Sequence, residues 1–187
     1  YYRILEKAKN VGATVFVHAE NGEILDFLRN ECVKKGQLTP KYHYVSRPPF
    51  TEAEGVRRAA YLAGKVGTPL YIAHVTSREA MAEIQEAKGK GINVNGESCT
   101  HYLTTTKEVL DNPDFNEAAK YVCSPALRDQ EDVDALWDAL NSGLLTAISS
   151  DHCGIDVAEL KQAGRDDFTQ IPNGSPGAGD RFSMIWT

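Results

Sequence analysis

Two histidines stand where two apolar segments of this sequence end. Residues 14–17, rich in β-branched and aromatic side chains, lead directly to His18, and residues 69–73 lead to His74. Runs of this composition that are followed by helical patterns are typical of buried strands in a parallel α/β sheet. Because parallel strands end at one edge of their sheet, we predict that both imidazoles lie on the rim where α/β folds carry their functional sites.

A third apolar segment, residues 144–150, ends at Asp151. Imidazole nitrogens and carboxylate oxygens both bind zinc and similar divalent metals, and a catalytic site needs only a few protein ligands besides an open position for water. Each residue alone has a structural alternative: a histidine can hydrogen-bond a loop, and Asp151 can cap a helix. Because three such residues occupy equivalent strand ends, we predict that His18, His74 and Asp151 are metal ligands.

Helical patterns separate these segments, so strands and helices alternate along the chain. The predicted strands are residues 14–17, 69–73, 92–97 and 144–150. The predicted helices are residues 2–10, the segment from His18 to about Gly36, residues 51–65, the segment capped by Ser77, and the segment that begins at Asp129 or Gln130. A βα repeat of this kind, joined by right-handed crossovers, predicts a parallel sheet in a single α/β domain.

The segment between the second and third predicted helices is polar and rich in proline. Residues 37–50 contain Pro40, Pro48 and Pro49. We predict a long loop at the functional rim, with His43 in solvent, because long loops in compact α/β domains tend to be functional or mobile. Residues 51–54 then match the capping-box pattern and predict that the next helix opens there.

Charge and composition exclude several classes of function. The 187 residues carry a formal net charge of -6, with 42% hydrophobic and 25% charged residues, as is ordinary for a globular domain. No basic stripe stands out, so we expect no nucleic-acid partner. No run approaches eighteen consecutive apolar residues, so we expect no membrane span.

The cysteines and the chain ends bear on the compartment and on the extent of the protein. Cys32, Cys99, Cys123 and Cys153 lie far apart, so neither a disulfide framework nor a structural zinc knuckle is predicted, and a cytoplasmic location is the simplest expectation. The first residue is not methionine, and the sequence stops inside an apolar segment at residues 184–187. We therefore expect an internal piece of a longer protein.

Five motifs carry a resemblance to a known family. They are HAENG at residues 18–22, AHVTS at 73–77, CSPALR at 123–128, SSDHC at 149–153 and DFTQIPNG at 167–174. Together, in this order, they resemble the hydantoinase and dihydropyrimidinase family of the amidohydrolase superfamily, over essentially the whole chain.

The resemblance implies a (β/α)8 barrel that holds two divalent metal ions, usually zinc, bridged by a hydroxide and a carbamylated lysine. His18 and His74 would then bind the more exposed metal and Asp151 the buried one. The four predicted strands would be strands five to eight, so residues 1–187 would form the C-terminal half of the barrel, truncated at both ends. The family's His-x-His pair and its modified lysine would lie upstream of Tyr1.

The resemblance also implies a reaction, the ring opening of a hydantoin or a dihydropyrimidine to an N-carbamoyl amino acid. Asp151 would act as the catalytic base, and Ser124 and Asn173 would bind the substrate. Without the resemblance, Ser124 before Pro125 and Asn173 before Gly174 are turn residues. The intact enzyme would be a cytoplasmic homotetramer of pyrimidine catabolism, and the 187-residue piece alone would be inactive.

Other polar residues near the strand ends are weaker candidates. His101 and His152 are expected in structural positions or as partners of the metal ligands, and Glu97 is a further candidate for the second role. Glu20 can hydrogen-bond neighbouring groups, and a purely structural role fits it equally well.

Alternatives to the leading function come from within and outside enzyme chemistry. Ala126 and Gly179 depart from the family pattern in loops that shape the pocket, so the substrate stays open. Allantoinase and dihydroorotase are the nearest enzymatic alternatives. A non-catalytic dihydropyrimidinase-related assembly protein is the alternative of another class, and the presence of a His-x-His pair and the lysine upstream would distinguish it.

Overall fold

The computed structural model describes residues 1–186 and contains a four-stranded parallel sheet with the strands in chain order. The strands are β1 (Val15–Val17), β2 (Leu70–Ile72), β3 (Val94–Cys99) and β4 (Ala147–Ser149). In the register, Val17 is opposite Ile72, and Cys99 is opposite Ser149. The predicted parallel α/β sheet is confirmed, and the strand ends meet at one edge, as expected from the sequence.

Nine α-helices and three 3-10 helices connect and extend the strands within residues 1–186. The α-helices are α1 (Tyr2–Asn10), α2 (Gly22–Lys34), α3 (Lys41–Val45), α4 (Pro49–Val66), α5 (Arg78–Gly89), α6 (Thr100–Thr104), α7 (Phe115–Ala119), α8 (Gln130–Asn141) and α9 (Arg181–Ile185). The 3-10 helices are η1 (Lys107–Asp111), η2 (Lys161–Gly164) and η3 (Phe168–Gln170). None of the helices in this part of the chain is long and apolar enough to span a bilayer.

Side-chain caps explain where several helices begin. Asn21 accepts a hydrogen bond from the backbone N–H of Ile24 at the start of α2, and Ser77 accepts one at the start of α5. Asp129 accepts from the N–H of Asp132, so it is the residue that caps α8. Each oxygen satisfies one of the backbone donors that a helix start leaves free.

The predicted loop at residues 37–50 is wrong in part. It contains α3, and α4 begins at Pro49, because a proline at the first helical position needs no N–H partner and already has a helical φ. The capping box is also wrong, since Thr51 lies inside α4 and donates to the carbonyl of Pro48, while Glu54 accepts a hydrogen bond from Asn21. His43, expected in solvent, is only 3% exposed and hydrogen-bonds a distant backbone carbonyl.

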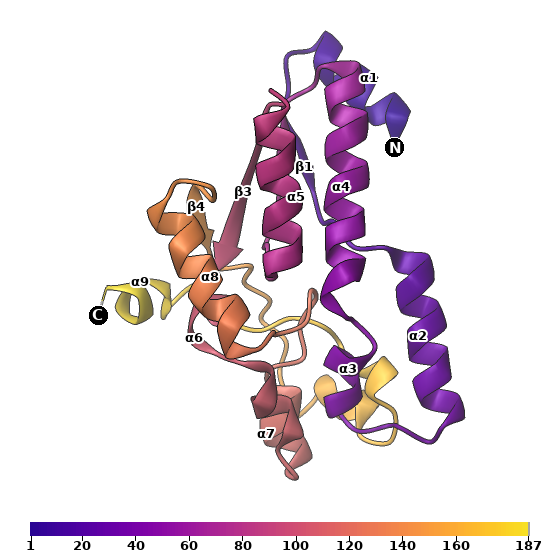
Figure 1. Cartoon of the computed structure of the whole chain (residues 1–187). Coiled ribbons are helices and arrows are strands. Elements are labelled where there is room, and N and C mark those ends of the chain that lie inside the picture. The colour runs from indigo at the N-terminus through magenta and orange to yellow at the C-terminus, as the bar shows by residue number, and fades with distance from the viewer. Residues whose placement is uncertain (187) are drawn as a thin grey trace.

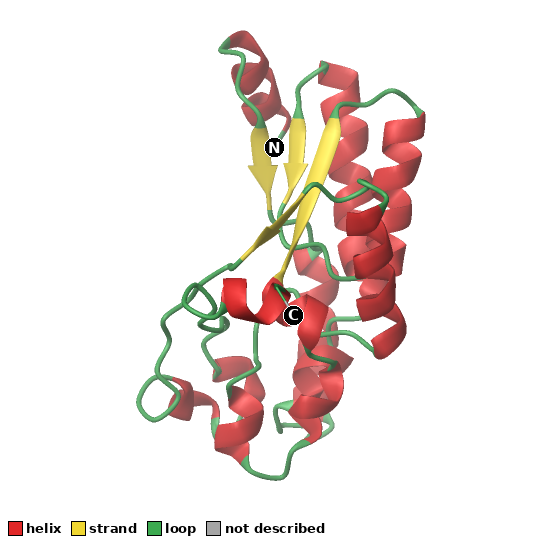
Figure 2. Ribbon diagram, turned by 90° about the vertical axis from the view of Figure 1, so that its left-hand side faces the viewer, coloured by secondary structure: helices red, strands yellow, loops and turns green. Residues whose placement is uncertain are grey.

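Helices cover one face of the sheet. Figure 1 shows α4 and α5 side by side along the strands, and Figure 2 shows that the long helices lie on one side of the sheet. Val56 of α4 and Ile84 of α5 are fully buried in one core with Ile72 of β2. On the other face Phe16 is 63% exposed and stacks on Tyr71, with ring centroids 5.4 Å apart.

A second, smaller core lies among the loops and short helices that follow the strands. Its buried members are Cys32, Leu110, Ala119, Val122, Phe168 and Ile171. Lys161 is fully buried beside it and donates to the carbonyls of Ala119 (2.8 Å) and Val122 (3.0 Å). This packing fixes the loops that carry the CSPALR and IPNG motifs.

Candidate functional site

His18 and His74 lie side by side at the carboxyl end of the sheet. They follow β1 and β2, which are hydrogen-bonded neighbours, and His18 Nδ1 lies 3.0 Å from His74 Nε2. The two rings meet edge to face, with centroids 4.6 Å apart. His74 is buried and has a φ of 37°, a left-handed conformation that is uncommon outside glycine and is often found at functional sites.

A buried carboxylate holds the other nitrogen of His18. His18 Nε2 donates to Glu20 Oε2 at 2.8 Å, and Arg47 Nη1 donates to the same oxygen, also at 2.8 Å. The Glu20 side chain is 2% exposed. Burial raises the pKa of Glu20, but the hydrogen bond from His18 and the nearby charges of Arg47, His18 and Arg128 outweigh it and bring the pKa to about 2. The carboxylate is therefore ionised at neutral pH.

A second buried carboxylate holds the loop that follows His74. Glu52 accepts hydrogen bonds from the backbone N–H of Thr76 (2.8 Å) and from the hydroxyl of Ser77 (2.9 Å). Arg128 donates to Glu52 at 3.2 Å, to the Thr76 hydroxyl at 2.9 Å, and to the backbone carbonyl of Arg47. One guanidinium thus links the loop after β2 to the segment that holds Glu20.

The imidazole of His74 is held neutral by its surroundings. Burial lowers the pKa of His74, and the neighbouring His18 lowers it further, while Asp151 and Glu20 act in the opposite direction. A neutral imidazole is the form that binds a metal.

Asp151 lies at the same edge of the sheet, directly beyond β4. It is exposed and has a φ of 42°, so two of the three predicted ligands have left-handed backbone conformations. Residues 152–155 are not helical, so the helix-cap alternative for Asp151 is wrong. Among residues 1–186, however, no three His, Cys, Asp or Glu side chains converge closely enough to form a metal site. The structure brings His18 and His74 together and leaves Asp151 outside that pair.

The histidine pair fits a shared divalent ion. Two nitrogens that bind one tetrahedral zinc ion at about 2.0–2.1 Å lie roughly 3.3 Å apart. The observed 3.0 Å between His18 Nδ1 and His74 Nε2 is within a few tenths of an ångström of that value. In addition, a metal-binding histidine normally donates its second N–H to a carboxylate or carbonyl, as His18 does to Glu20.

Ser124 and Asn173, the predicted substrate-binding residues, are in direct contact. The Ser124 hydroxyl donates to Asn173 Oδ1 at 2.7 Å, although 49 positions separate the two residues. The backbone N–H of Gly174 donates to the carbonyl of Val122 at 2.9 Å and holds the two loops together. The pair therefore presents polar groups from two motifs at one place.

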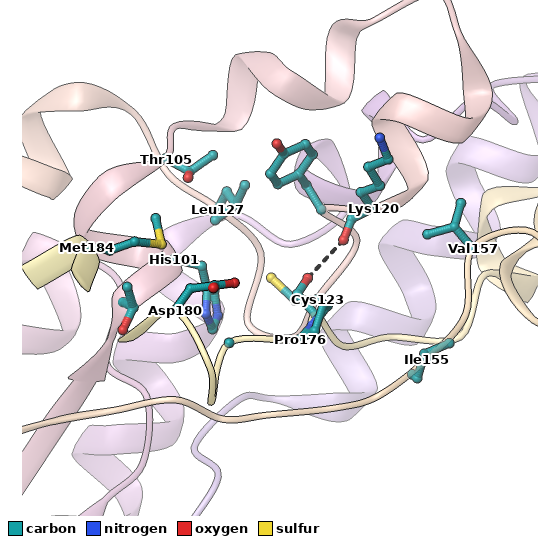
Figure 3. Close-up of a pocket in the computed structure, with 14 residues that line it drawn as sticks. His101, Thr105, Lys120, Cys123, Leu127, Ile155, Val157, Pro176, Asp180 and Met184 are labelled. Carbon is teal, nitrogen blue, oxygen red and sulfur yellow. Dashed lines mark hydrogen bonds between the residues drawn. The ribbon is translucent and has the colours of Figure 1, made fainter. Parts of the chain in front are cut away.

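His101 lines a cavity of about 430 Å³ between the loops that follow β3 and β4 (Figure 3). Both of its ring nitrogens are buried and have no hydrogen-bond partner within residues 1–186. Burial lowers the pKa of His101 to about 4, against the charge of Asp151, which raises it. The lining is mostly apolar, with Leu127, Ile155 and Met184 among its members.

His152 and Glu97 make contacts that secure loops and strands. His152 Nδ1 accepts hydrogen bonds from the backbone N–H groups of Gly177 (3.1 Å) and Ala178 (3.3 Å). Glu97 accepts hydrogen bonds from the hydroxyls of Ser149 (2.7 Å) and Tyr71 (3.1 Å), and so ties three neighbouring strands together.

Comparison with known proteins identifies the family. No protein-family model matches the chain. The chain is 47% identical to a D-hydantoinase of Ralstonia pickettii over 98% of its length, and 41% identical to a dihydropyrimidinase of Arabidopsis thaliana over 97%. A solved D-hydantoinase structure, 47% identical, superposes with a TM-score of 0.97 over 99% of this chain and 40% of that one. The chain belongs to the hydantoinase and dihydropyrimidinase family.

The hydantoinase-family chain spans about 40% of the length of the first relative and 34% of the second.

The residues that sequence reasoning missed are Arg47, Glu52 and Arg128, which connect the loops behind the two histidines. Arg128 lies inside the CSPALR motif, so the motif could have identified it as a candidate. Arg47 sits in a polar segment, where a charged side chain normally indicates solvent exposure.

Proposed function

We propose that the protein that contains this chain hydrolyses cyclic amides and opens a hydantoin or dihydropyrimidine ring to the N-carbamoyl amino acid. The observation that carries this proposal is the His18–His74 pair at the edge of a parallel sheet in a chain 47% identical to a D-hydantoinase. The contact between Ser124 and Asn173 supports it, because it brings together the two loops whose backbone groups would hydrogen-bond a cyclic ureide.

The fold proposal is that residues 1–187 form strands five to eight of a (β/α)8 barrel, as one partial barrel domain. The uncovered face of the sheet supports it, since the interior of a closed barrel is filled by side chains from all of its strands. Two divalent ions, zinc by preference, would be held in the full-length protein. His18, His74 and Asp151 would be the ligands from this chain, and a carbamylated lysine outside it would bridge the ions.

The residues of this chain then have distinct tasks. When bound, the metal ions supply an activated water and polarise the substrate carbonyl. The Asp151 carboxylate accepts the proton of the attacking water and returns it to the ring nitrogen as the C–N bond breaks. Ser124 and Asn173 hold the ring so that the carbonyl carbon faces the water.

The test is a ring-opening assay of the full-length protein with hydantoin, dihydrouracil, allantoin and dihydroorotate, beside an Asp151→Asn variant and a measurement of bound metal. We expect turnover by the wild type, and a loss of about 10²–10⁴-fold in kcat for the variant, because the amide cannot accept the proton. Circular dichroism checks that the variant is folded. Turnover confined to allantoin or dihydroorotate would move the protein to one of those activities, and no turnover together with no bound metal would support the non-catalytic alternative.

The remaining parts of the proposal concern the setting of the enzyme. We propose that the intact protein is a homotetramer that acts in the cytoplasm in pyrimidine catabolism. The relatives named dihydropyrimidinase support the metabolic role.

A further inference from the structure

We propose that Glu20, anchored by Arg47, is a positioning residue that fixes the tautomer of His18, so that Nδ1 keeps its lone pair for a metal ion. The inference rests on the proposed metal-dependent function and adds residues to it that bind no metal themselves. It starts from the fact that a neutral imidazole carries one proton and can place it on either nitrogen.

The hydrogen bonds of His18 decide between the two tautomers. A carboxylate can only accept a hydrogen bond, so the 2.8 Å contact between His18 Nε2 and Glu20 Oε2 requires the proton on Nε2. Nδ1 is then unprotonated, and it is the nitrogen that lies 3.0 Å from His74 Nε2. This distance is a hydrogen bond in which His74 Nε2 donates to His18 Nδ1, and a metal ion that displaced that proton would be shared by the same two nitrogens.

The geometry of the ion pair shows that Glu20 is aimed at His18 as well as at Arg47. An arginine and a carboxylate that only form an ion pair prefer two parallel hydrogen bonds. Here a single oxygen, Oε2, accepts from both Arg47 and His18. Glu20 Oε1 and Arg47 Nε are both buried without a hydrogen-bond partner in residues 1–186. The Glu20 carboxylate therefore makes one hydrogen bond with Arg47 in place of a bidentate pair, and the same oxygen bonds the imidazole of His18.

Arg47 is in turn held in place by the network behind His74. Its backbone carbonyl accepts a hydrogen bond from Arg128, which also donates to the Thr76 hydroxyl two residues beyond His74. Arg128 therefore holds both Arg47, whose side chain orients Glu20, and the loop that carries His74. Through it, the positions of the two imidazoles depend on each other.

The experiment measures zinc affinity of the full-length protein by competition with a chelator, for the wild type and for two variants. The first is Glu20→Gln, which keeps an acceptor oxygen without the charge. The second is the double variant Glu20→Met/Arg47→Met, which removes both members of the buried pair and so leaves no unpaired charge to unfold the loop. We expect zinc to bind about 10–100-fold more weakly in the double variant, as is typical when the partner of a metal-binding histidine is lost, with a smaller loss in Glu20→Gln.

Glu54→Gln is the matched control. Glu54 holds the same loop through Asn21, at 2.7 Å, and is paired with Arg58, but it does not bond His18. We expect its zinc affinity to stay within about twofold of wild type. Thermal unfolding of the metal-free proteins separates positioning from stability: the double variant should unfold within a few degrees of the wild type.

Three outcomes would overturn the inference. Zinc affinity within twofold of wild type in both Glu20 variants would show that the carboxylate does not act on the ligand. An equal loss in Glu54→Gln would assign the effect to the loop. A loss of affinity accompanied by an equal loss of metal-free stability would assign a structural role. Failure of the wild type itself to bind zinc would instead remove the proposed metal-dependent function, and the inference with it.

Discussion

At the scale of single residues, the site depends on imidazoles that burial keeps neutral. His74, His101 and His43 all have lowered pKa values, and in each case burial is the main cause. Desolvation disfavours the charged form of a histidine, because an imidazolium loses the hydration that water provides. These side chains therefore make the protein sensitive to acid, even though they lie in different parts of the molecule.

His43 should make the largest single contribution to acid sensitivity. Its Nε2 donates to the carbonyl of Cys123 at 2.7 Å, and burial lowers its pKa from 6.5 to about 3. The unfolded chain takes up a proton as the pH falls through 6.5, whereas the folded protein does so only near pH 3. Stability is therefore complete above about pH 6.5 and is lost progressively below it, by about 2 kcal/mol between pH 7.5 and pH 5 from this side chain.

Urea unfolding of the full-length protein at several pH values, with His43→Gln beside the wild type, measures this effect. The amide of the variant can still donate to Cys123 but does not titrate, so its stability should fall less steeply below pH 6.5. Parallel curves for the two proteins would show that His43 does not govern the response.

At the scale of elements, the contact between α4 and the loop after β1 places the site. Gly55 of α4 lies against the backbone of Ala19 and Glu20, the residues that immediately follow His18. A Cβ at position 55 would lie 2.7 Å from the carbonyl carbon of Ala19, which is closer than real contacts allow. Glycine is therefore required here by packing, because helix and loop touch through their backbones.

Gly55→Ala should destabilise the protein and displace the His18 loop. Alanine favours the helix by up to about 1 kcal/mol, but the overlap with backbone atoms costs about 1–3 kcal/mol or more, so the net change is a loss of stability. Zinc affinity should fall as well, since His18 and Glu20 move together. Thermal unfolding and chelator competition measure the two effects.

Gly89→Ala is the control for this substitution, because a Cβ at that helical position meets nothing within 4 Å. It should leave stability unchanged or raise it slightly. If Gly55→Ala changed neither the unfolding temperature nor the zinc affinity, the loop after β1 would accommodate the methyl group without loss of stability, and the packing argument would be wrong.

At the scale of the whole molecule, the chain exposes strand edges and an apolar face of the kind that other parts of a protein normally cover. β1 and β4 are the two edges of the sheet, and Phe16 is exposed on the face opposite α4 and α5. Unpaired strand edges and uncovered apolar faces promote association with other chains. In the proposed barrel, both features would be covered by the remaining strands.

Expressed alone, residues 1–187 should aggregate and show no ring-opening activity, even with added zinc. Among residues 1–186 only two imidazoles converge, which is too few ligands for a two-metal site. Size-exclusion chromatography with light scattering should give large, heterogeneous species for the isolated chain and a homotetramer for the full-length protein. Turnover of hydantoin or dihydrouracil by the isolated chain would contradict the two-metal assignment.

Local patterns in the sequence were enough to predict the architecture and the rim residues. Three of the four strands lie in short apolar runs, and Asn21, Ser77 and Asp129 cap helices through contacts that span three positions. Since parallel strands end at a common edge, the residues that follow them could be placed together as well. His18 and His74 were predicted for this reason, and their contact confirms that they share one rim.

Only the tertiary structure decided which polar residues are buried and what they contact. Arg47 meets Glu20 across 27 positions, His43 meets Cys123 across 80, and Arg128 reaches Glu52 across 76. No periodic pattern encodes such contacts, because they depend on how loops from different βα units pack over the strand ends. The same polar side chain is stable in solvent or in a satisfied buried network, and packing alone selects between the two.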